Sequence, residues 1–446
     1  MRVDYDHLPR QAIDTTKLDI LDVLGTAMAG STAEGAESVA DLIKDWGGKK
    51  ESTVIGFDCM VPSANAAWVN GMLSHALDYD DGHDGAVLHA AASVVPAAFA
   101  VAQRKGAVSG KDFIAAVALG IDLMCRMGLA SKTNLRDSGW VYTSIFGYFG
   151  SAAAAGKVLK LSSHQMVNAL GISLSQAAGS FQSIADAALT KRMQPGFASK
   201  GGVLAALLAE RGITGPTNCI DGEWGIYKLY LRGQYEQEVL TAELGSRFEV
   251  VNMGFKAYPC CGYTHGPIEG TLSLIQANGI KPENIHAINI SVGSNAADLF
   301  VPLERKRRPT TVPDAQFSIP YTVAAAALKG SVTIADFTPD AIRDPRVLDI
   351  AQRVSPIILK ELTRREIEPS IVEIVTRDGN LYTKRIEYRK GTPNNPMSPE
   401  EMAYKFRDCL SFGRRHIGAQ DADDLIDILM NLENLEDVGS VIRALG

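Results

Sequence analysis

Small residues recur at helical spacing over the first 250 residues of the chain. Ala, Gly and Leu carry the pattern in stretches such as TTKLDILDVLGTAMAG, KDFIAAVALGIDLMCRMGLA and GGVLAALLAERG. Because these residues lie on several faces of each helix, they favour helices that pack closely on other helices over amphipathic surface helices. The first 250 residues therefore predict an all-helical domain.

The pattern changes near Val250, where strand-like segments begin. Alternation of apolar and polar residues predicts a strand over 286–294, and 371–388 predicts a hairpin that turns at Asp378-Gly379. Helices are expected between them, over 318–328 and 339–353. The middle of the chain is therefore expected to be an α/β module.

Helical character returns after this module. Ser398, Pro399 and Glu401 supply the N-cap, the first-turn proline and the capping-box glutamate of a helix over 399–411, and a last helix is expected over roughly 420–444. At 446 residues the chain is also too long for one ordinary core. The sequence thus predicts a mostly α protein with an α/β part: a large all-helical domain over 1–251 and 394–446, and a smaller α/β lid domain over 252–393.

Composition limits the partners and the compartment. The net charge of −7 makes a nucleic-acid-binding role unexpected, because such proteins usually carry a basic face. The longest apolar stretch, Gly85 to Gln103, predicts a buried helix and not a membrane span. Six cysteines without a C-x-x-C pair, behind an N-terminal segment without an apolar signal core, fit a cytoplasmic protein with reduced thiols.

The densest polar segment is HALDYDDGHD (75–84), with His89 shortly after it. It allows three interpretations. A polar loop could cap the neighbouring helices, or His75, Asp78, Asp80 and His83 could bind a metal ion as in a metal-dependent hydrolase. The third interpretation is a general acid/base site in which Asp78 and His89 lie in a partly desolvated cleft.

Two further segments carry candidate site residues. Lys191 and Arg192 precede an apolar helix, where they either bind a substrate carboxylate or form a basic helix start. The segment KAYPCCGYTH (256–265) joins the two predicted domains, and domain junctions often hold substrate clefts. Within it, Cys261 beside His265 is either a nucleophile or an inert buried thiol.

Taken together and in order, the motifs of the chain resemble the MmgE/PrpD family of 2-methylcitrate dehydratases, cis-aconitate decarboxylases and related epimerases. The resemblance covers nearly the whole chain and includes TVIG (53–56), AAWVNG (66–71), HALDYDD (75–81), FGYFGSAAAAGK (146–157), SQAAGS (175–180), GITGP (212–216), QFSIPY (316–321) and NPMSPEE (395–401). It implies a homodimer that works without a metal ion or an organic cofactor, in agreement with the absence of nucleotide-binding fingerprints.

The resemblance also implies site residues. It places Asp78, His89, Lys191, Lys256 and Tyr321 at active-site positions of the family. Lys191 and Lys256, or Arg192 as an alternative cation, would neutralise charge on a substrate carboxylate. Asp78 or His89 would exchange a proton on the adjacent carbon. Tyr321 or His265 would serve the opposite face of the substrate or the leaving group.

The chain departs from the family pattern at several of these positions. Gly82 follows HALDYDD where the family often has Thr, and Val141 and Gln194 each replace a family histidine. Cys261, expected to line the substrate site, stands where decarboxylase-like members can carry His.

Three functions therefore stay open. We expect first a cofactor-independent lyase acting on a small polycarboxylate, a dehydratase before a decarboxylase. An epimerase of a dicarboxylate such as iminodisuccinate would use the same proton-transfer step. A carboxylate-binding dimer without catalysis is the alternative that the replaced residues suggest.

Overall fold

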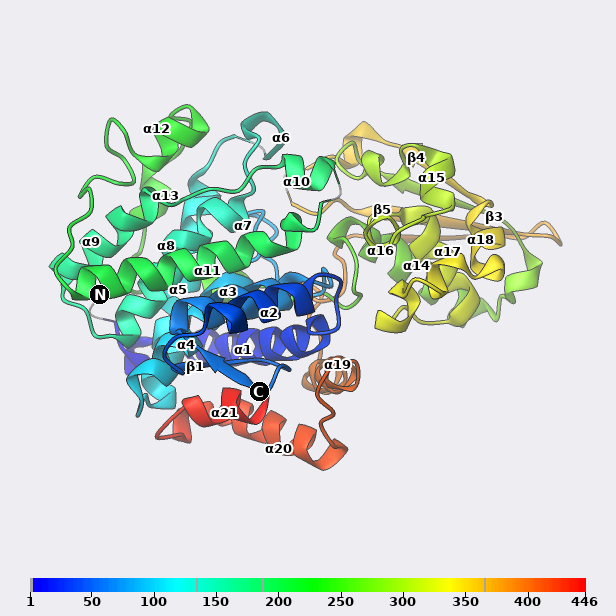
Figure 1. Ribbon diagram of the computed structural model, residues 1–446. Coiled ribbons are helices and arrows are strands. Elements are labelled where there is room, and N and C mark those ends of the chain that lie inside the picture. The colour runs from blue at the N-terminus through cyan, green and yellow to red at the C-terminus, as the bar shows by residue number, and fades with distance from the viewer. Residues whose placement is uncertain (1–2, 134, 187, 365) are drawn as a thin grey trace. The chain divides into compact units, whose positions relative to one another are not determined.

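The computed structural model describes residues 3–133, 135–186, 188–364 and 366–446. The chain divides into two compact units, a helical unit formed by Met1–Met253 with Ser398–Gly446 and an α/β unit formed by Gly254–Met397. These limits lie close to the expected domain boundaries at 251/252 and 393/394. The predicted mostly α fold with an α/β part is confirmed (Figure 1).

The long helices of the helical unit form its core. Helix α3 packs between α11 and α1, α8 contacts α4, α5 and α11, and α19 packs on α1 (Figure 1). The helices are α1 (Arg10–Gly30), α2 (Ala36–Trp46), α3 (Ser63–His75), α4 (Ala91–Lys105), α5 (Gly110–Ala130), α6 (Leu135–Ser138), α7 (Tyr142–Ile145), α8 (Gly147–Val158), α9 (Ser163–Leu174), α10 (Gln182–Ala185), α11 (Thr190–Glu210), α12 (Ile226–Leu231), α13 (Gln237–Thr241), α19 (Pro399–Ser411), α20 (Ala419–Met430) and α21 (Gly439–Ala444). The unit also has the short 3-10 helices η1 (Tyr5–His7), η2 (Glu249–Asn252) and η8 (Leu432–Asn434).

Glycines allow the core helices to approach closely, as the small-residue pattern predicts. A Cβ atom on Gly71 of α3 would lie 2.9 Å from the Cα atom of Gly196 on α11. A Cβ atom on Gly120 of α5 would lie 2.8 Å from the carbonyl oxygen of Gly150 on α8. Any side chain at these positions would push the helices apart, so these glycines determine how closely the helices pack.

The α/β unit is built on one four-stranded sheet in the order β4-β3-β5-β6. Strand β3 (Ile285–Val292) runs parallel to β4 (Val354–Ile358) and antiparallel to β5 (Ser370–Thr376), which pairs with β6 (Leu381–Ile386). The remaining helices are α14 (Gly262–Asn278), α15 (Leu303–Arg307), α16 (Val312–Gln316), α17 (Ile319–Lys329) and α18 (Pro345–Ala351), with 3-10 helices η3 (Pro282–Asn284), η4 (Ala297–Phe300), η5 (Ile334–Phe337), η6 (Ala341–Arg343) and η7 (Lys360–Leu362). Helix α14 packs on β5 and β6, and α17 packs on α14 and α18.

Most predicted elements of the α/β unit and of the C-terminal return are confirmed. The predicted strand over 286–294, the hairpin at Asp378-Gly379 and the helix over 318–328 correspond to β3, β5–β6 and α17. Helix α19 has the bounds expected for 399–411, and the Ser398–Glu401 capping box is formed. Strand β4 was not expected, because Pro356 interrupts its short apolar segment and proline is disfavoured inside strands.

Four local expectations are wrong. The helix expected over 420–444 ends at Met430, because Asn431 adopts φ −120° and the chain continues through η8 to α21. The segment over 339–353 forms η6 and α18, separated at Asp344, and not one helix. Residues 85–90 are not helical, so α4 begins only at Ala91. The helical region also contains a small hairpin, β1 (Ser52–Val54) with β2 (Cys59–Val61).

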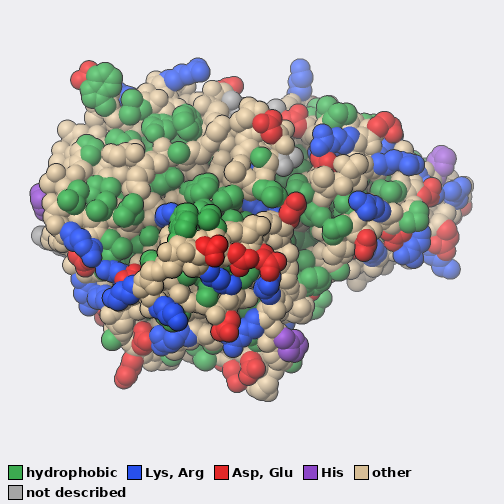
Figure 2. Space-filling model, in the orientation of Figure 1, with side chains coloured by type: hydrophobic (Ala, Val, Ile, Leu, Met, Phe, Trp, Pro, Cys, Tyr) green, Lys and Arg blue, Asp and Glu red, His purple; other side chains and the backbone are tan. Residues whose placement is uncertain are grey.

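Helix α5, and not the 85–103 stretch, is long and apolar enough to cross a membrane by length and composition. However, 83% of its apolar window is buried inside the protein, as expected for a core helix. On the face shown in Figure 2, side chains of both charges mix with hydrophobic ones.

Candidate active site

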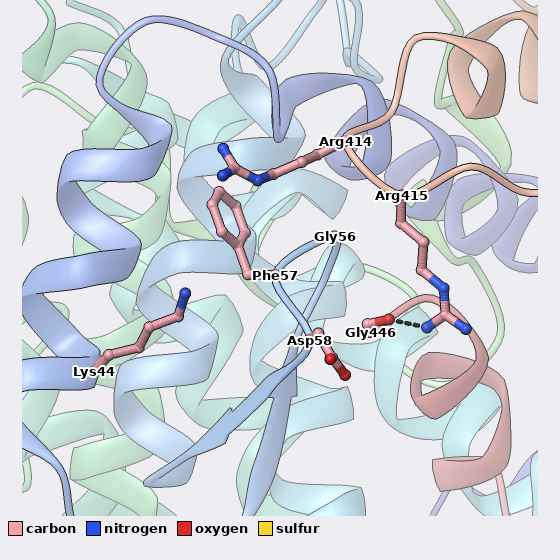
Figure 3. A pocket seen from close by; sticks show the side chains of 7 residues that line it. All are labelled: Lys44, Gly56, Phe57, Asp58, Arg414, Arg415 and Gly446. Carbon is pink, nitrogen blue, oxygen red and sulfur yellow. Dashed lines mark hydrogen bonds between the residues drawn. The ribbon is translucent and has the colours of Figure 1, made fainter.

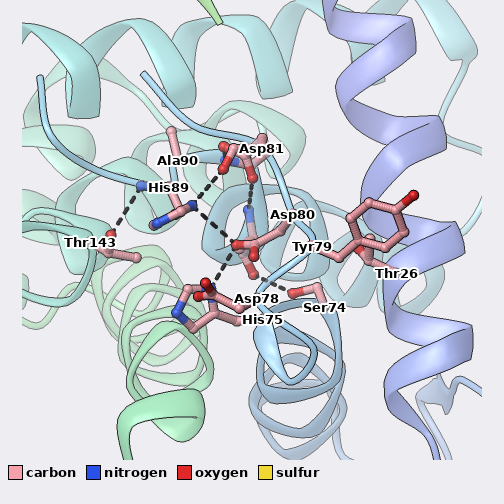
Figure 4. A network of polar contacts seen from close by, with 12 residues as sticks. Thr26, Ser74, His75, Asp78, Tyr79, Asp80, Asp81, His89, Ala90 and Thr143 are labelled. Atoms are coloured by element: carbon pink, nitrogen blue, oxygen red, sulfur yellow. Dashed lines mark hydrogen bonds and ion pairs between the residues drawn. The ribbon is translucent and has the colours of Figure 1, made fainter. Parts of the chain in front are cut away.

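The polar segment HALDYDDGHD forms a loop between α3 and α4 in the helical unit, and it brings the candidate groups together (Figure 4). Asp78, Asp80, Asp81, His75 and His83 are all buried. Since ionised groups are costly to bury without partners, each must be held by specific contacts. The structure shows such contacts for every one of them, and they come from several elements.

Lys191 and Asp78 form an ion pair across the helical unit. Lys191, in the first turn of α11, places its Nζ atom 2.6 Å from Asp78 Oδ1. Asp78 has φ +55°, a left-handed conformation that is uncommon outside glycine. The Lys191 side chain keeps 21% of its surface exposed, so it can also meet a ligand. A carboxylate thus offsets the unfavourable position of a cation at a helix N-terminus.

Arg192 lies next to this pair and is buried. Its guanidinium donates to the backbone oxygen of Glu34. Burial lowers the pKa of Arg192, an effect that the nearby charges of Glu34 and Asp78 oppose. A second cation therefore lies at this end of α11, and its part in carboxylate binding stays a prediction.

His89 is the most accessible imidazole of the loop. Its side chain is 26% exposed, against 4% for His75 and 6% for His83. The Nδ1 atom of His89 donates to the backbone oxygen of Asp81 at 2.5 Å. A carbonyl oxygen only accepts, so Nδ1 carries the hydrogen and Nε2 is the basic nitrogen of the neutral ring.

Asp80 joins the two imidazoles. Its Oδ2 atom lies 2.7 Å from His75 Nδ1 and 3.5 Å from His89 Nδ1, and the two rings meet edge to face at 5.0 Å. Burial lowers the pKa of His75, while the charge of Asp80 acts in the opposite direction. Asp80 thus contacts both imidazoles, whereas the sequence indicated it only as a possible metal ligand.

The same three residues define the metal alternative. The ligand atoms of His75, Asp80 and His89 lie within 4.8 Å of one another and could hold a metal ion. This set differs from the one expected, because Asp78 pairs with Lys191 and His83 lies 3.5 Å from Glu249. In the structure, His75 Nδ1 faces the Asp80 carboxylate and His89 Nδ1 faces the backbone oxygen of Asp81, both at hydrogen-bond distance.

Asp81 anchors the loop to the following helix. Its two carboxylate oxygens accept from the backbone amides of Ala91 and Ala92 at the N-terminus of α4, at 3.0 and 3.2 Å. The backbone amide of His89 donates to Thr143 Oγ1. Val87, a β-branched residue, is held at φ +58°, which is a strained conformation. The loop is therefore rigidly placed on both sides of His89.

A buried carboxyl lies behind this loop. Asp19 of α1 is fully buried, and its two oxygens have no hydrogen-bond partner among the described residues. Burial raises the pKa of Asp19 well above its ordinary value, and the nearby charges of Asp81 and Asp22 act in the same direction. Protonation of Asp19 is therefore favoured in the folded unit.

The other expected site residues lie in the α/β unit. Lys256 and His265 are buried, and His265 Nε2 lies 3.2 Å from the backbone oxygen of Cys260. The backbone amide of Cys261, which is half-buried, donates to the oxygen of Gln316. Tyr321 is fully buried in the hydrophobic core, and its hydroxyl donates to the backbone oxygen of Asp336 at 2.5 Å. Their catalytic or binding roles stay predictions.

The replaced family positions have structural partners here. Gln194 donates from its Nε2 atom to the oxygen of Ser180 and to Ser183 Oγ, so it holds the segment before α11. A Cβ atom on Gly82 would lie 3.8 Å from His89 Nδ1, so Gly82 borders the same imidazole. Val141 precedes α7 and donates its backbone amide to the oxygen of Gly179.

A separate pocket of about 520 Å³ lies elsewhere in the helical unit (Figure 3). Lys44, Phe57, Asp58, Arg414 and Arg415 line it, together with Gly56 and Gly446. None of the expected site residues lines this pocket.

Comparison with known proteins identifies the family to which the chain belongs. The MmgE/PrpD N-terminal domain matches residues 1–238, and the MmgE/PrpD C-terminal domain matches residues 258–434. The chain is 28% identical to a cis-aconitate decarboxylase of Aspergillus terreus, over 99% of this chain and 93% of the relative. It is 29% identical to the human cis-aconitate decarboxylase, over 97% and 89% of the two chains.

A more distant relative bears a different name. A probable 2-methylcitrate dehydratase of Saccharomyces cerevisiae is 20% identical over 95% of this chain and 85% of the relative. The chain is therefore a member of the MmgE/PrpD family, and its enzyme class is that of the named relatives, the lyases.

Proposed function

We propose that the protein is a lyase that acts on a small polycarboxylate and exchanges a proton on the carbon next to a substrate carboxylate. The observation that carries this proposal is the combination of an accessible ammonium, Lys191, and an accessible imidazole, His89, on one rigid buried network. The ammonium binds anions, and the imidazole transfers protons near neutral pH.

Each group has a distinct role in the proposal. Lys191 neutralises the substrate carboxylate as charge develops on it, with the Arg192 cation next to it along α11. Asp78 orients the Lys191 ammonium through their ion pair. His89 exchanges the proton through Nε2, because Nδ1 is held by the Asp81 carbonyl.

We propose cis-aconitate as the first substrate to test. Five relatives at 28–29% identity are named as cis-aconitate decarboxylases or a decarboxylase-like protein, whereas the dehydratase relative is only 20% identical. This similarity favours decarboxylation over the dehydration expected first from the sequence. In such a reaction the bond from the methylene carbon to its carboxyl carbon breaks and carbon dioxide leaves. The electron pair of that bond forms the new double bond, and a proton is added to the former alkene carbon that already carries one hydrogen.

The same proposal includes activity without a metal ion or organic cofactor, a homodimer and a cytoplasmic location. The resemblance to the family supports the homodimer and the activity without a metal ion or cofactor, and the cysteine pattern with the N-terminal segment supports the cytoplasmic location. Full activity after dialysis against a chelator would support the metal-free mechanism, and activity that returns only with an added ion would contradict it. Light scattering during size-exclusion chromatography measures the oligomeric state.

Proton NMR of the purified protein in deuterium oxide tests the proposed reaction. Separate samples would contain cis-aconitate, 2-methylcitrate, citrate or iminodisuccinate. New terminal methylene signals with deuterium in the product indicate decarboxylation, and a new alkene signal from 2-methylcitrate or citrate indicates dehydration. Deuterium in unreacted iminodisuccinate would indicate an epimerase. A substrate that raises the melting temperature without any exchange would indicate the non-catalytic carboxylate-binding protein.

A further inference from the structure

The C-terminal return of the chain contacts the middle of the active-site loop. Tyr79 stands between Asp78 and Asp80, and its backbone oxygen accepts a hydrogen bond of 2.7 Å from Lys405 Nζ. The same ammonium lies 4.0 Å from the centroid of the Tyr79 ring and 2.6 Å from Asp22 Oδ1 on α1. Lys405 is thus placed to fix the peptide group that connects the two carboxylates.

The Lys405 side chain is buried and held in place. Its side chain is only 3% exposed, and it projects from α19, the helix that begins at the Ser398–Glu401 capping box and packs on α1. Its ammonium is held by an anion, a carbonyl oxygen and an aromatic face. This set of partners gives the ammonium a single position.

Stability alone does not account for such a buried pair. Removing two charges from water is costly, and an apolar pair of similar volume is often as stable as a buried ion pair. The loop, in contrast, contains a residue at φ +55°, Asp78, directly before Tyr79. Such a conformation persists only where its surroundings hold it.

We propose that Lys405 is a positioning residue that holds the 78–80 peptide so that Asp78 and Asp80 meet Lys191 and the two imidazoles. The inference rests on the proposed function, because it takes Lys191 and His89 as the groups that meet the substrate. Loss of the Lys405 contact releases the Tyr79 carbonyl. Asp78 and Asp80 then shift relative to Lys191, His75 and His89.

The helical unit offers a matched control. Lys17 of α1 is also buried, with its side chain 1% exposed, and it donates to the oxygen of Met430 at 2.7 Å and lies 3.2 Å from Glu433. Like Lys405, it joins α1 to the C-terminal segment through a carbonyl oxygen and a carboxylate. Its hydrogen bonds and ion pairs are with Met430, Glu433 and Asp14, and none is with the described residues of the 76–90 loop, so its removal perturbs comparable packing of α1 without touching the site.

The experiment compares two double variants of the full chain, Asp22→Asn/Lys405→Met and Lys17→Met/Glu433→Gln. We expect the first to lower kcat for cis-aconitate by roughly tenfold to a hundredfold, the usual cost of displacing catalytic groups by a remote change. Its thermal midpoint should stay within about 5 °C of that of the control variant. The control should keep kcat within about twofold of wild type. Equal kcat losses in both variants, or none in the first, would overturn the proposal.

A second readout does not depend on turnover. Long-range proton–nitrogen NMR spectra of protein labelled with ¹⁵N-histidine report the ring nitrogens, and His75→Gln and His89→Gln variants assign the two signals. Both signals should shift in Asp22→Asn/Lys405→Met and not in the control. If wild type converts none of the tested polycarboxylates, the proposed function fails, while these shifts still decide the positioning role.

If the first variant does not fold, Asp22→Leu/Lys405→Met replaces it, because it exchanges the ion pair for two apolar side chains, and the same results are expected. If neither variant folds, Lys405 is required for folding and the positioning role is overturned.

Discussion

Two charged regions of the helical unit differ sharply in construction. Around the 76–90 loop, buried carboxylates and imidazoles are held by partners from α3, α4, α11 and η2, and Lys405 of α19 holds the Tyr79 carbonyl. In the pocket of Figure 3, the Lys44 and Arg414 side chains are 39% and 46% exposed and pair with surface acids, Asp41 and Glu37. The pocket is open but its charged side chains are exposed, whereas the charged side chains of the loop are buried and held in fixed positions.

This difference teaches how a site can be recognised. Exposed ion pairs contribute little because water and salt screen them. Buried charges in fixed positions are costly to keep, and they exert a strong field on whatever meets them. The rigid, partly accessible groups therefore indicate the reaction centre more reliably than the open pocket does.

The largest effects should follow from breaking the ion pair at the loop. We expect Lys191→Ala and Asp78→Asn each to lower turnover by at least about a thousandfold, because they remove the ammonium or its orientation. Thermal stability should stay within about 1–2 kcal/mol of wild type. Steady-state kinetics and calorimetry measure both quantities. Large stability losses with only modest loss of turnover would assign these charges a structural role.

A smaller effect is expected when Asp80 loses its charge. Asp80→Asn keeps the shape of the side chain but weakens its hold on His75 and His89, so kcat should fall by roughly tenfold to a hundredfold. The KM value should change much less, because Asp80 is fully buried. A mainly KM effect, measured over a full substrate titration, would contradict this assignment.

Asp19 should affect stability and not turnover, with a defined pH dependence. The unfolded chain ionises this carboxyl near 3.8, whereas burial raises its pKa in the folded unit. Rising pH therefore favours the unfolded state, and the stability present below pH 3.8 is lost as the pH approaches the folded pKa. Asp19→Asn removes this loss, so it should be more stable than wild type by at least about 1 kcal/mol at pH 8.

The advantage of Asp19→Asn should shrink as the pH is lowered towards 4. Thermal melts of both proteins from pH 4 to pH 8 measure it. An advantage that is constant with pH, or larger in acid, would show that Asp19 is ionised in the folded protein.

The smallest effect is expected at the open pocket. Arg414→Ala removes an exposed ion pair with Glu37 and a contact with the Phe57 ring, at 5.2 Å. Stability should change by less than about 1 kcal/mol, and turnover should stay within about twofold of wild type. A large loss of turnover would assign this pocket to the active site and would contradict the assignment of the reaction centre to the 76–90 loop alone.

The sequence predicts much of this molecule for identifiable physical reasons. Capping residues such as Ser398 and turn residues such as Gly379 act locally, so the corresponding elements were predicted correctly. The parallel strand β4 depends on pairing with a distant segment, and the Asn431 break depends on packing, so neither was predicted.

The same distinction applies to the site. Asp78, His89 and Lys191 lie in conspicuous polar motifs, and the structure joins Asp78 to Lys191 across 113 positions of sequence. Lys405 lies in an ordinary helix sequence, 326 positions from its partner Tyr79, and no local pattern indicates it. Contacts made by backbone carbonyl groups leave no signature in the side-chain sequence.

Deuterium incorporation measured by proton NMR tests the central claim most directly, with wild type and Lys191→Ala compared in deuterium oxide with cis-aconitate. The account predicts a deuterated product with a terminal methylene signal from wild type and none from Lys191→Ala at equal protein concentration. Equal product formation by both proteins would contradict it, because the ammonium at the loop would then have no part in the reaction.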